Sequence, residues 1–145
     1  MDWHADWENA QAIPVVASPA CSAEQCQALE LFLIGMDMIP IWSKDHPGLY
    51  VIRSIAMLVN EACEAVLHDI ASEQDIDSAM KYGVNYPCGP FEWADKIGYY
   101  TILQILENMY RIYDEGRYIT SIYLAKKAVQ GHAQKTQQQP LRVAG

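Results

Sequence analysis

Hydrophobic residues recur at helical spacing through the second part of the chain. They stand three and four residues apart from Leu49 to Ile70, which predicts one long helix with apolar surface on two sides. From Tyr99 to Gly116 they fall on one face, the pattern of a surface helix. A last helix, capped by Thr120 or Ser121, is predicted before a polar tail, residues 132–145, which is expected to be disordered.

The predicted long helix leaves only a narrow band for water. Because apolar positions surround most of its circumference, we expect a central helix or one that binds a partner. The residues assigned to the polar band are Arg53, Asn60, Glu61, Glu64 and His68.

The first third of the chain has the pattern of a small strand-helix-strand unit. Residues 12–17 and 38–42 are short apolar runs, and a helix is predicted between them from Ser22 to Gly35. The two strands are expected to pair in parallel and to form only a marginal sheet. Residues 1–11 are expected to be a flexible N-terminus, the alternative being one amphipathic turn that docks through its two tryptophans.

Between the long helix and the surface helix lies a sharp corner, Val84–Pro90. Ser72 has the position of a helix cap, and its helix is expected to close with Gly83 in the left-handed conformation. The corner cannot be helical, because it contains two prolines and a glycine. Pro90 suits the first position of a second helix, which Gly98 is expected to end.

The residues around this corner form an ordered and specific set. Its members are Asp75-Ile76-Asp77, Ala79-Met80-Lys81, Gly83, Tyr86-Pro87, Gly89-Pro90-Phe91-Glu92, Ala94-Asp95 and Ile97-Gly98. The set resembles the C-terminal helical domain of the 3-hydroxyacyl-CoA (3-hydroxybutyryl-CoA) dehydrogenases, and the similarity extends from about Pro47 to about Val129.

This resemblance implies a mainly α fold: a helical bundle of the 6-phosphogluconate dehydrogenase C-terminal-domain-like type, preceded by a short βαβ remnant. The expected parts are a flexible N-terminus at 1–11, a remnant of a nucleotide-binding domain at 12–46, the helical domain at 47–131 and a disordered tail at 132–145. We therefore expect the chain to be cut inside or just before the final layer of that nucleotide-binding domain.

One position departs from the family pattern. The resemblance implies an active-site asparagine before the arginine of a G-[FL]-x-V-N-R segment, and in Gly48–Arg53 this sequence has Ile52 there. Isoleucine has no group that can hold a substrate oxygen. With the pattern of Val51–Ala62, this departure resembles the second, degenerate helical domain of tandem-domain bacterial enzymes. That resemblance implies packing on a sister helical domain through Leu49–Ile70. In the isolated chain, we expect a homodimer to bury the same apolar helix.

The sequence lacks the parts that a nicotinamide enzyme needs. Its eight glycines include no pair separated by one residue, so it has no G-x-G-x-x-G turn to bind a pyrophosphate. The resemblance implies a catalytic histidine and its glutamate in the nucleotide-binding domain, and none of the four histidines has a matching context. We therefore expect no catalytic residue and no bound cofactor in this chain; NAD belongs to the parent enzyme.

Other candidate groups have structural interpretations. Asp75 and Asp77 are expected to open one helix, and Glu92 and Asp95 to line the outer face of the next, rather than to form acid-base pairs. Cys88 has no base nearby in the sequence that could make it a nucleophile.

Charge and composition exclude other classes of function. A formal net charge of -8 and a pI near 4.8 argue against a nucleic-acid or anionic-membrane surface. The four cysteines lack the spacing of a zinc site and the density of a secreted scaffold, so we expect reduced thiols and no metal site. The sequence has no apolar run of membrane-spanning length and no signal-peptide pattern at its start, so we expect a cytoplasmic protein.

The resemblance and the missing residues together predict the oligomerisation and substrate-side domain of an NAD-dependent 3-hydroxyacyl-CoA dehydrogenase, inactive as an isolated chain. Acyl-CoA is the expected substrate of the parent enzyme. Alternatives are a non-enzymatic dimerisation or interaction module derived from that family, and the helical half of another β-hydroxyacid dehydrogenase. The residues expected on the substrate side are Ile52, Asn85, Tyr86, Pro87, Cys88, Gly89 and Pro90.

Overall fold

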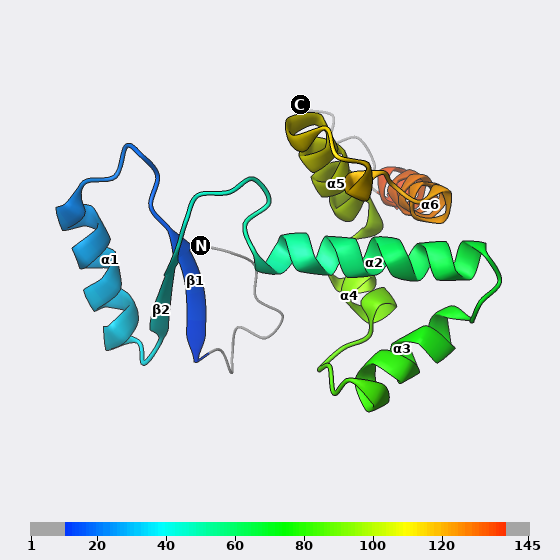
Figure 1. Cartoon of the computed structure of the whole chain (residues 1–145), viewed down its shortest axis with the longest axis horizontal. Helices are drawn as coiled ribbons and strands as arrows, with labels where there is room; N and C mark the ends of the chain where they lie inside the picture. Colours follow the sequence, from blue (N-terminus) through cyan, green and yellow to red (C-terminus); the bar gives the residue numbers. More distant parts are fainter. Residues whose placement is uncertain (1–10, 139–145) are drawn as a thin grey trace, which may run out of the picture. The chain divides into compact units, whose positions relative to one another are not determined.

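The computed structural model describes residues 11–138 (Figure 1). The chain forms two compact units, Met1–Ser54 and Ile55–Gly145. The expected flexible N-terminus, as far as residue 10, and the end of the expected tail, residues 139–145, lie outside the described residues.

The first unit contains a parallel strand-helix-strand element, as predicted. β1 (Ala12–Val16) and β2 (Ile39–Ser43) pair in parallel, and α1 (Ala23–Gly35) connects them (Figure 1). Side chains alternate along β1, so every second residue enters the core of the unit. That core consists of Ile13, Val15 and Leu33, with Leu29 and Met38 packed against it.

The ends of α1 follow from local chemistry. Ser22 and Gln25 form a capping box, in which each side chain accepts the backbone N–H of the other residue. At the other end, Asp37 has a φ of 57°, and the N–H of Met38 donates to the carbonyl of Leu33 at 3.0 Å. The helix thus ends at Gly35 as predicted, and an aspartate two residues later takes the left-handed conformation.

The second unit is a bundle of helices, which confirms the predicted mainly α fold. Along the chain, α2 begins just before the unit and continues into it, and α5 packs against α6 while α3 packs against α4 (Figure 1). The elements are α2 (Val51–Leu67), α3 (Glu73–Gly83), α4 (Pro90–Ile97), α5 (Tyr99–Tyr113), the 3₁₀ helix η1 (Gly116–Tyr118) and α6 (Ile122–Gln138). The core includes Ile55, Val59, Cys63, Phe91, Ile102, Leu106, Met109, Tyr118, Leu124 and Ala128.

Helix α2 is the predicted long helix, with differences at its end and in its polar band. It ends at Leu67, because Asp69 has a φ of 54° and the N–H of Ile70 donates to the carbonyl of Ala65. Ile70, expected on the buried stripe, is 74% exposed. Asn60, assigned to the polar band, is only 3% exposed. Its burial follows from the partners that it binds: its Nδ2 donates to the carbonyl of Ile119, and its Oδ1 accepts the N–H of Ser121.

The last two long helices also differ from the prediction at their ends. Helix α5 ends at Tyr113, because Asp114 takes the left-handed conformation with a φ of 51°, and Gly116 instead begins η1. Of the two candidate caps of α6, Ser121 is the one whose hydroxyl accepts a backbone N–H, that of Tyr123. Helix α6 continues to Gln138, so the first residues of the expected disordered tail are helical.

Candidate functional site

The corner begins where α3 ends. Ser72 caps this helix as predicted, because its hydroxyl accepts the N–H of Asp75. Gly83, expected to be left-handed, remains in the helix, and Asn85 takes the positive φ instead, at 58°. The N–H of Tyr86 then donates to the carbonyl of Met80 at 3.2 Å. The backbone on the α3 side of the corner is therefore held by a hydrogen bond back to the helix.

The other side of the corner is held by Asp77. The N–H groups of Phe91 and Glu92 donate to Asp77 Oδ1 and Oδ2, at 2.8 Å and 3.1 Å. Gly89 is the N-cap residue of α4 and has no side chain of its own to accept them. The expectation that Asp77 opens its own helix is therefore wrong: this carboxylate caps the next helix.

Glu92 and Lys81 form an ion pair across the same junction. One oxygen of Glu92 pairs with Lys81 Nζ, and the other accepts the N–H of Gly89 at 3.1 Å. The hydrogen bond to Glu92 raises the pKa of Lys81, and the bonds from Lys81 and Gly89 lower the pKa of Glu92. Because both side chains are partly exposed, the pair adds little stability.

The corner residues divide into an outer and an inner group. Asn85, Tyr86 and Pro87 are exposed, whereas Cys88, Gly89 and Pro90 are buried. Of the six corner residues predicted on the substrate side, 85–90, three therefore have side chains that are accessible to a ligand. The inner group supports the others.

Two side chains of α4 lie against the corner. The ring of Trp93 is 5.6 Å from that of Tyr86, centroid to centroid. Lys96 Nζ lies 3.0 Å from the sulfur of Cys88. Among the described side chains of residues 11–131, the indole N–H of Trp93 is the buried group without a hydrogen-bond partner.

Ile52 lies in the first turn of α2 and is half-buried. It belongs to the first unit, whereas the corner belongs to the second. Its side chain offers only hydrocarbon, so it can contact an acyl chain but cannot hold a substrate oxygen.

A second polar cluster joins α3 to α6. Tyr123 Oη donates to Glu73 Oε1 at 2.6 Å, and Lys127 Nζ lies 2.6 Å from the same oxygen and 5.4 Å from the ring centroid of Tyr99. Burial by itself raises the pKa of Glu73, but the hydrogen bonds from Lys127 and Tyr123 outweigh burial, so the pKa is lowered. The hydrogen bond to Glu73 raises the pKa of Tyr123 to about 12.

We expect this cluster to make the second unit lose stability as the pH becomes acidic. Because the pKa of Glu73 is lower in the folded state than its usual 4.5, its ionised form stabilises the fold above that pH. The contribution is lost as the pH falls through the folded pKa. Urea unfolding from about pH 7 to about pH 3 should therefore show a steeper loss of stability in the wild type than in Glu73→Gln.

The matched control for this prediction is Glu107→Gln, on the exposed face of α5. It should keep the wild-type dependence on pH. Equal pH profiles for Glu73→Gln and the wild type would contradict the assignment.

Cys63 lies beneath this cluster and should be chemically inert. Burial raises the pKa of its thiol to about 12, whereas Cys21 is exposed. Because the thiolate is the reactive form, iodoacetamide near neutral pH should label Cys21 at least about 100-fold faster than Cys63. Peptide mass spectrometry measures both rates, and urea should make them equal. Fast labelling of Cys63 in the folded protein would show that it is not buried.

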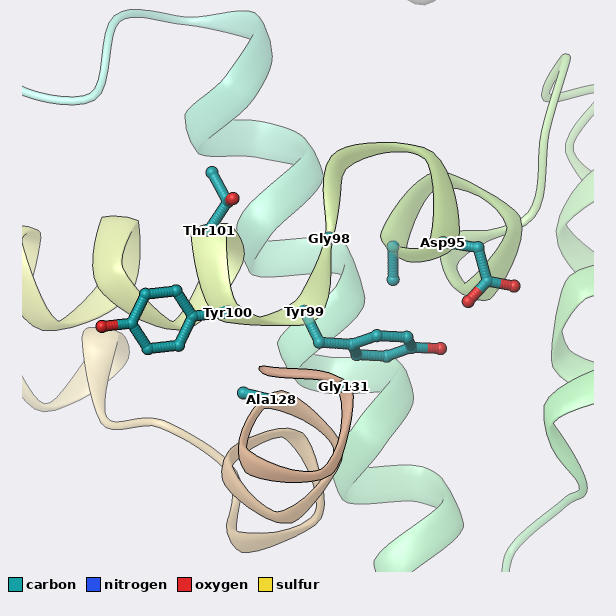
Figure 2. A pocket seen from close by; sticks show the side chains of 8 residues that line it. Asp95, Gly98, Tyr99, Tyr100, Thr101, Ala128 and Gly131 are labelled. Atoms are coloured by element: carbon teal, nitrogen blue, oxygen red, sulfur yellow. The ribbon is translucent and has the colours of Figure 1, made fainter. Parts of the chain in front are cut away.

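A pocket of about 210 Å³ lies beside the first turn of α5, against α6 (Figure 2). Figure 2 shows the ring of Tyr99 near Asp95 and the ring of Tyr100 on the opposite side. The lining residues are Ala94, Asp95, Gly98, Tyr99, Tyr100, Thr101, Ala128 and Gly131. None of them belongs to the corner, so the pocket and the predicted site are separate features.

Among the side chains that the structure describes, residues 11–131, no three His, Cys, Asp or Glu come together as metal ligands. His46 and His68 are both exposed, and His68 lies 3.5 Å from Glu64 of its own helix. No helix in this range is long and apolar enough to cross a membrane.

The profile of the 3-hydroxyacyl-CoA dehydrogenase C-terminal domain matches residues 48–142. The chain belongs to this family. The match includes the corner and both helices that flank it, so the resemblance drawn from their motifs is confirmed.

Two relatives with this domain are much longer than the chain. The 3-hydroxyadipyl-CoA dehydrogenase of Escherichia coli (strain K12) is 46% identical over 85 residues, which are 59% of this chain and 18% of that protein. The mitochondrial hydroxyacyl-coenzyme A dehydrogenase of Homo sapiens is 33% identical over 100 residues, 69% of this chain and 32% of that protein. The chain thus spans less than a third of either relative.

Solved structures of 3-hydroxybutyryl-CoA dehydrogenases share the fold. That from Escherichia coli K12 matches with a TM-score of 0.79 and 33% identity, over 86% of this chain and 26% of that one. The (S)-3-hydroxybutyryl-CoA dehydrogenase of Ralstonia eutropha matches with a TM-score of 0.77 and 28% identity, over 85% of this chain and 44% of that one.

Proposed function

We propose that this chain is the C-terminal, substrate-side and oligomerisation domain of an NAD-dependent 3-hydroxyacyl-CoA dehydrogenase. The observation that carries the proposal is the family match over residues 48–142. The parent reaction oxidises a 3-hydroxyacyl-CoA to a 3-oxoacyl-CoA, in fatty-acid or aromatic-acid degradation. The four free cysteines suit a reducing compartment, and we place the protein in the cytoplasm.

The chain by itself does not fit NAD. A dinucleotide needs a glycine-rich turn between a strand and a helix N-terminus, and the connection from β1 to α1, residues 17–22, contains no glycine. NAD would supply the hydride acceptor in the parent reaction. We therefore propose that the isolated chain is inactive and that catalysis belongs to a nucleotide-binding domain.

The corner is the part that we propose to contact the acyl-CoA. Asn85, Tyr86 and Pro87 are exposed and combine one amide with two apolar surfaces, which suits an acyl chain next to a polar thioester. Cys88, Gly89 and Pro90 then serve as the inner support of this surface. Ile52 would add only an apolar contact.

The proposed partner is a second copy of the chain or a sister helical domain, through Leu49–Ile70. Its support is that several apolar residues of α2 are only half-buried, among them Met57, Leu58 and Val66. Ile70, just beyond the helix, is largely exposed. Apolar surface of this kind is stabilised when a partner covers it.

A non-enzymatic interaction module derived from the same family is the second candidate. Two observations favour it. Ile52 cannot bind a substrate oxygen, and the given sequence has no dinucleotide-binding turn. The two candidates differ in whether the corner retains affinity for an acyl thioester.

Calorimetric titration with NADH and with acetoacetyl-CoA, beside a sizing measurement, distinguishes them. The substrate-side proposal expects acetoacetyl-CoA to bind more tightly than CoA alone, no NADH binding at about micromolar concentration, and a dimer. Tyr86→Ala should weaken acetoacetyl-CoA binding, whereas the matched Tyr82→Ala, at an exposed position of α3, should not. Equal affinity for CoA and acetoacetyl-CoA would favour the module, and micromolar NADH binding would overturn the account of the cofactor.

A further inference from the structure

The first turn of α4 receives its cap from another helix. Gly89 occupies the N-cap position without a side chain, so the N–H groups of Phe91 and Glu92 need an acceptor from elsewhere. The two oxygens of Asp77, which lies in α3, accept one N–H each. Asp77 therefore connects α3 and α4 across the corner, 14 residues away from Phe91 in the sequence.

The close approach of the Asp77 side chain to the backbone of Gly89 depends on glycine. A β-carbon at Gly89 would lie 2.2 Å from Cγ and Oδ1 of Asp77 and 2.4 Å from its Cβ. Asp77 is 9% exposed, so its carboxylate has little room to move without losing both hydrogen bonds. Gly89 thus leaves space for the Asp77 carboxylate, and that carboxylate caps α4.

The corner is consequently held at both ends. On the α3 side, Asn85 is left-handed and the N–H of Tyr86 bonds back to Met80. On the α4 side, Asp77 fixes the turn that follows Gly89. Only Pro87 and Cys88 lie between the two fixed points, and a segment this short with both ends held has few conformations.

We propose that Asp77 is the positioning residue of the corner: by capping α4 it fixes the conformation in which Asn85, Tyr86 and Pro87 are presented to a ligand. The effect on acyl-CoA binding rests on the proposed function, whereas the positioning of the backbone does not.

The test compares Asp77→Asn, Asp77→Ala and Asp75→Asn in the full chain. Asparagine keeps one acceptor for the two N–H groups, and alanine keeps none. Asp75→Asn is the matched control, because it makes the same change in the same helix at an exposed position that serves only the local Ser72 cap.

The first measurement is two-dimensional ¹⁵N NMR with hydrogen exchange. Asp77→Ala should lower the protection of the Phe91 and Glu92 amides at least about ten-fold, with a smaller loss in Asp77→Asn. The decisive signals are the amides of Asn85, Tyr86 and Cys88, since Asp77 has no hydrogen bond to them. They should shift in both Asp77 variants and stay in place in Asp75→Asn. Corner amides that shift no more in Asp77→Asn than in the control would overturn the proposal, even if Asp77→Ala fails to fold.

A second measurement separates this proposal from the proposed function. Acetoacetyl-CoA added to the wild type should move the corner amides, and Asp77→Asn should weaken its binding several-fold while the far-ultraviolet circular dichroism stays unchanged. If Asp77→Asn moves the corner but the ligand does not, the positioning role stands and the substrate role fails. If the ligand moves the corner and Asp77→Asn does not, the positioning role fails alone.

Discussion

Replacing Gly89 by alanine is expected to lower the free energy of unfolding of the second unit by about 3 kcal/mol. The φ of Gly89 is -75°, which any residue adopts, so the cost comes from the collision of the new β-carbon with Asp77. Relief of that collision requires Asp77 to give up its hydrogen bonds to the first turn of α4. Urea unfolding followed by circular dichroism measures the loss.

The matched control is Gly83→Ala. A β-carbon there meets no atom within 4 Å, and Gly83 is helical without a positive φ. Alanine at this position should raise the free energy of unfolding by about 0.5–1 kcal/mol, because it restricts the unfolded chain and favours the helix. If both alanine variants had the same effect, the contact between Gly89 and Asp77 would have no energetic importance.

Replacing Asn60 by alanine should also cost about 3 kcal/mol. Asn60 donates to the carbonyl of Ile119 at 3.0 Å and accepts the N–H of Ser121 at 2.8 Å, so its loss leaves a buried N–H without an acceptor. The turn before α6 would then lose its attachment to α2. Thermal unfolding, with hydrogen exchange at Ser121, measures both effects.

The comparison variant is Asn108→Ala on α5. Its side chain is exposed and bonds to Arg111 one turn away, so the expected change is within about 0.5 kcal/mol. A loss of stability in Asn60→Ala no larger than this would show that the turn before α6 holds without Asn60.

Local features of the fold were predictable because the residues that decide them are close in sequence. Ser22 and Ser72 cap the helices that follow them through N–H groups three residues away. The apolar spacing of residues 51–67 indicated α2, and the short apolar runs indicated two strands joined by a helix.

Helix ends were predicted less well, because aspartate and asparagine took the place of glycine. Asp37, Asp69, Asn85 and Asp114 are left-handed, whereas the expected Gly83 is not. A short polar side chain tolerates this conformation better than other side chains do, so a pattern of glycines alone misses these left-handed residues, although Gly98 ends α4 as predicted.

Contacts between distant residues could not be predicted from spacing at all. Asn60 looked like a surface residue and Asp77 like an ordinary acid of a first turn, because their partners lie 59 and 14 residues further along. The same holds for Glu73 and Tyr123, 50 residues apart. For the candidate site, the sequence predicted that Val84–Pro90 is a bend, but not which of its residues are exposed.

The left-handed aspartates have a consequence for heat resistance. Asp37, Asp69 and Asp114 stand at the C-terminal ends of α1, α2 and α5, with φ values of 57°, 54° and 51°. A β-carbon is strained in this conformation, and a negative charge is unfavourable beside the carbonyl end of a helix. The sequence is thus not optimised for stability at these three surface positions. Glycine or asparagine there should raise the melting temperature of the protein without changing the corner.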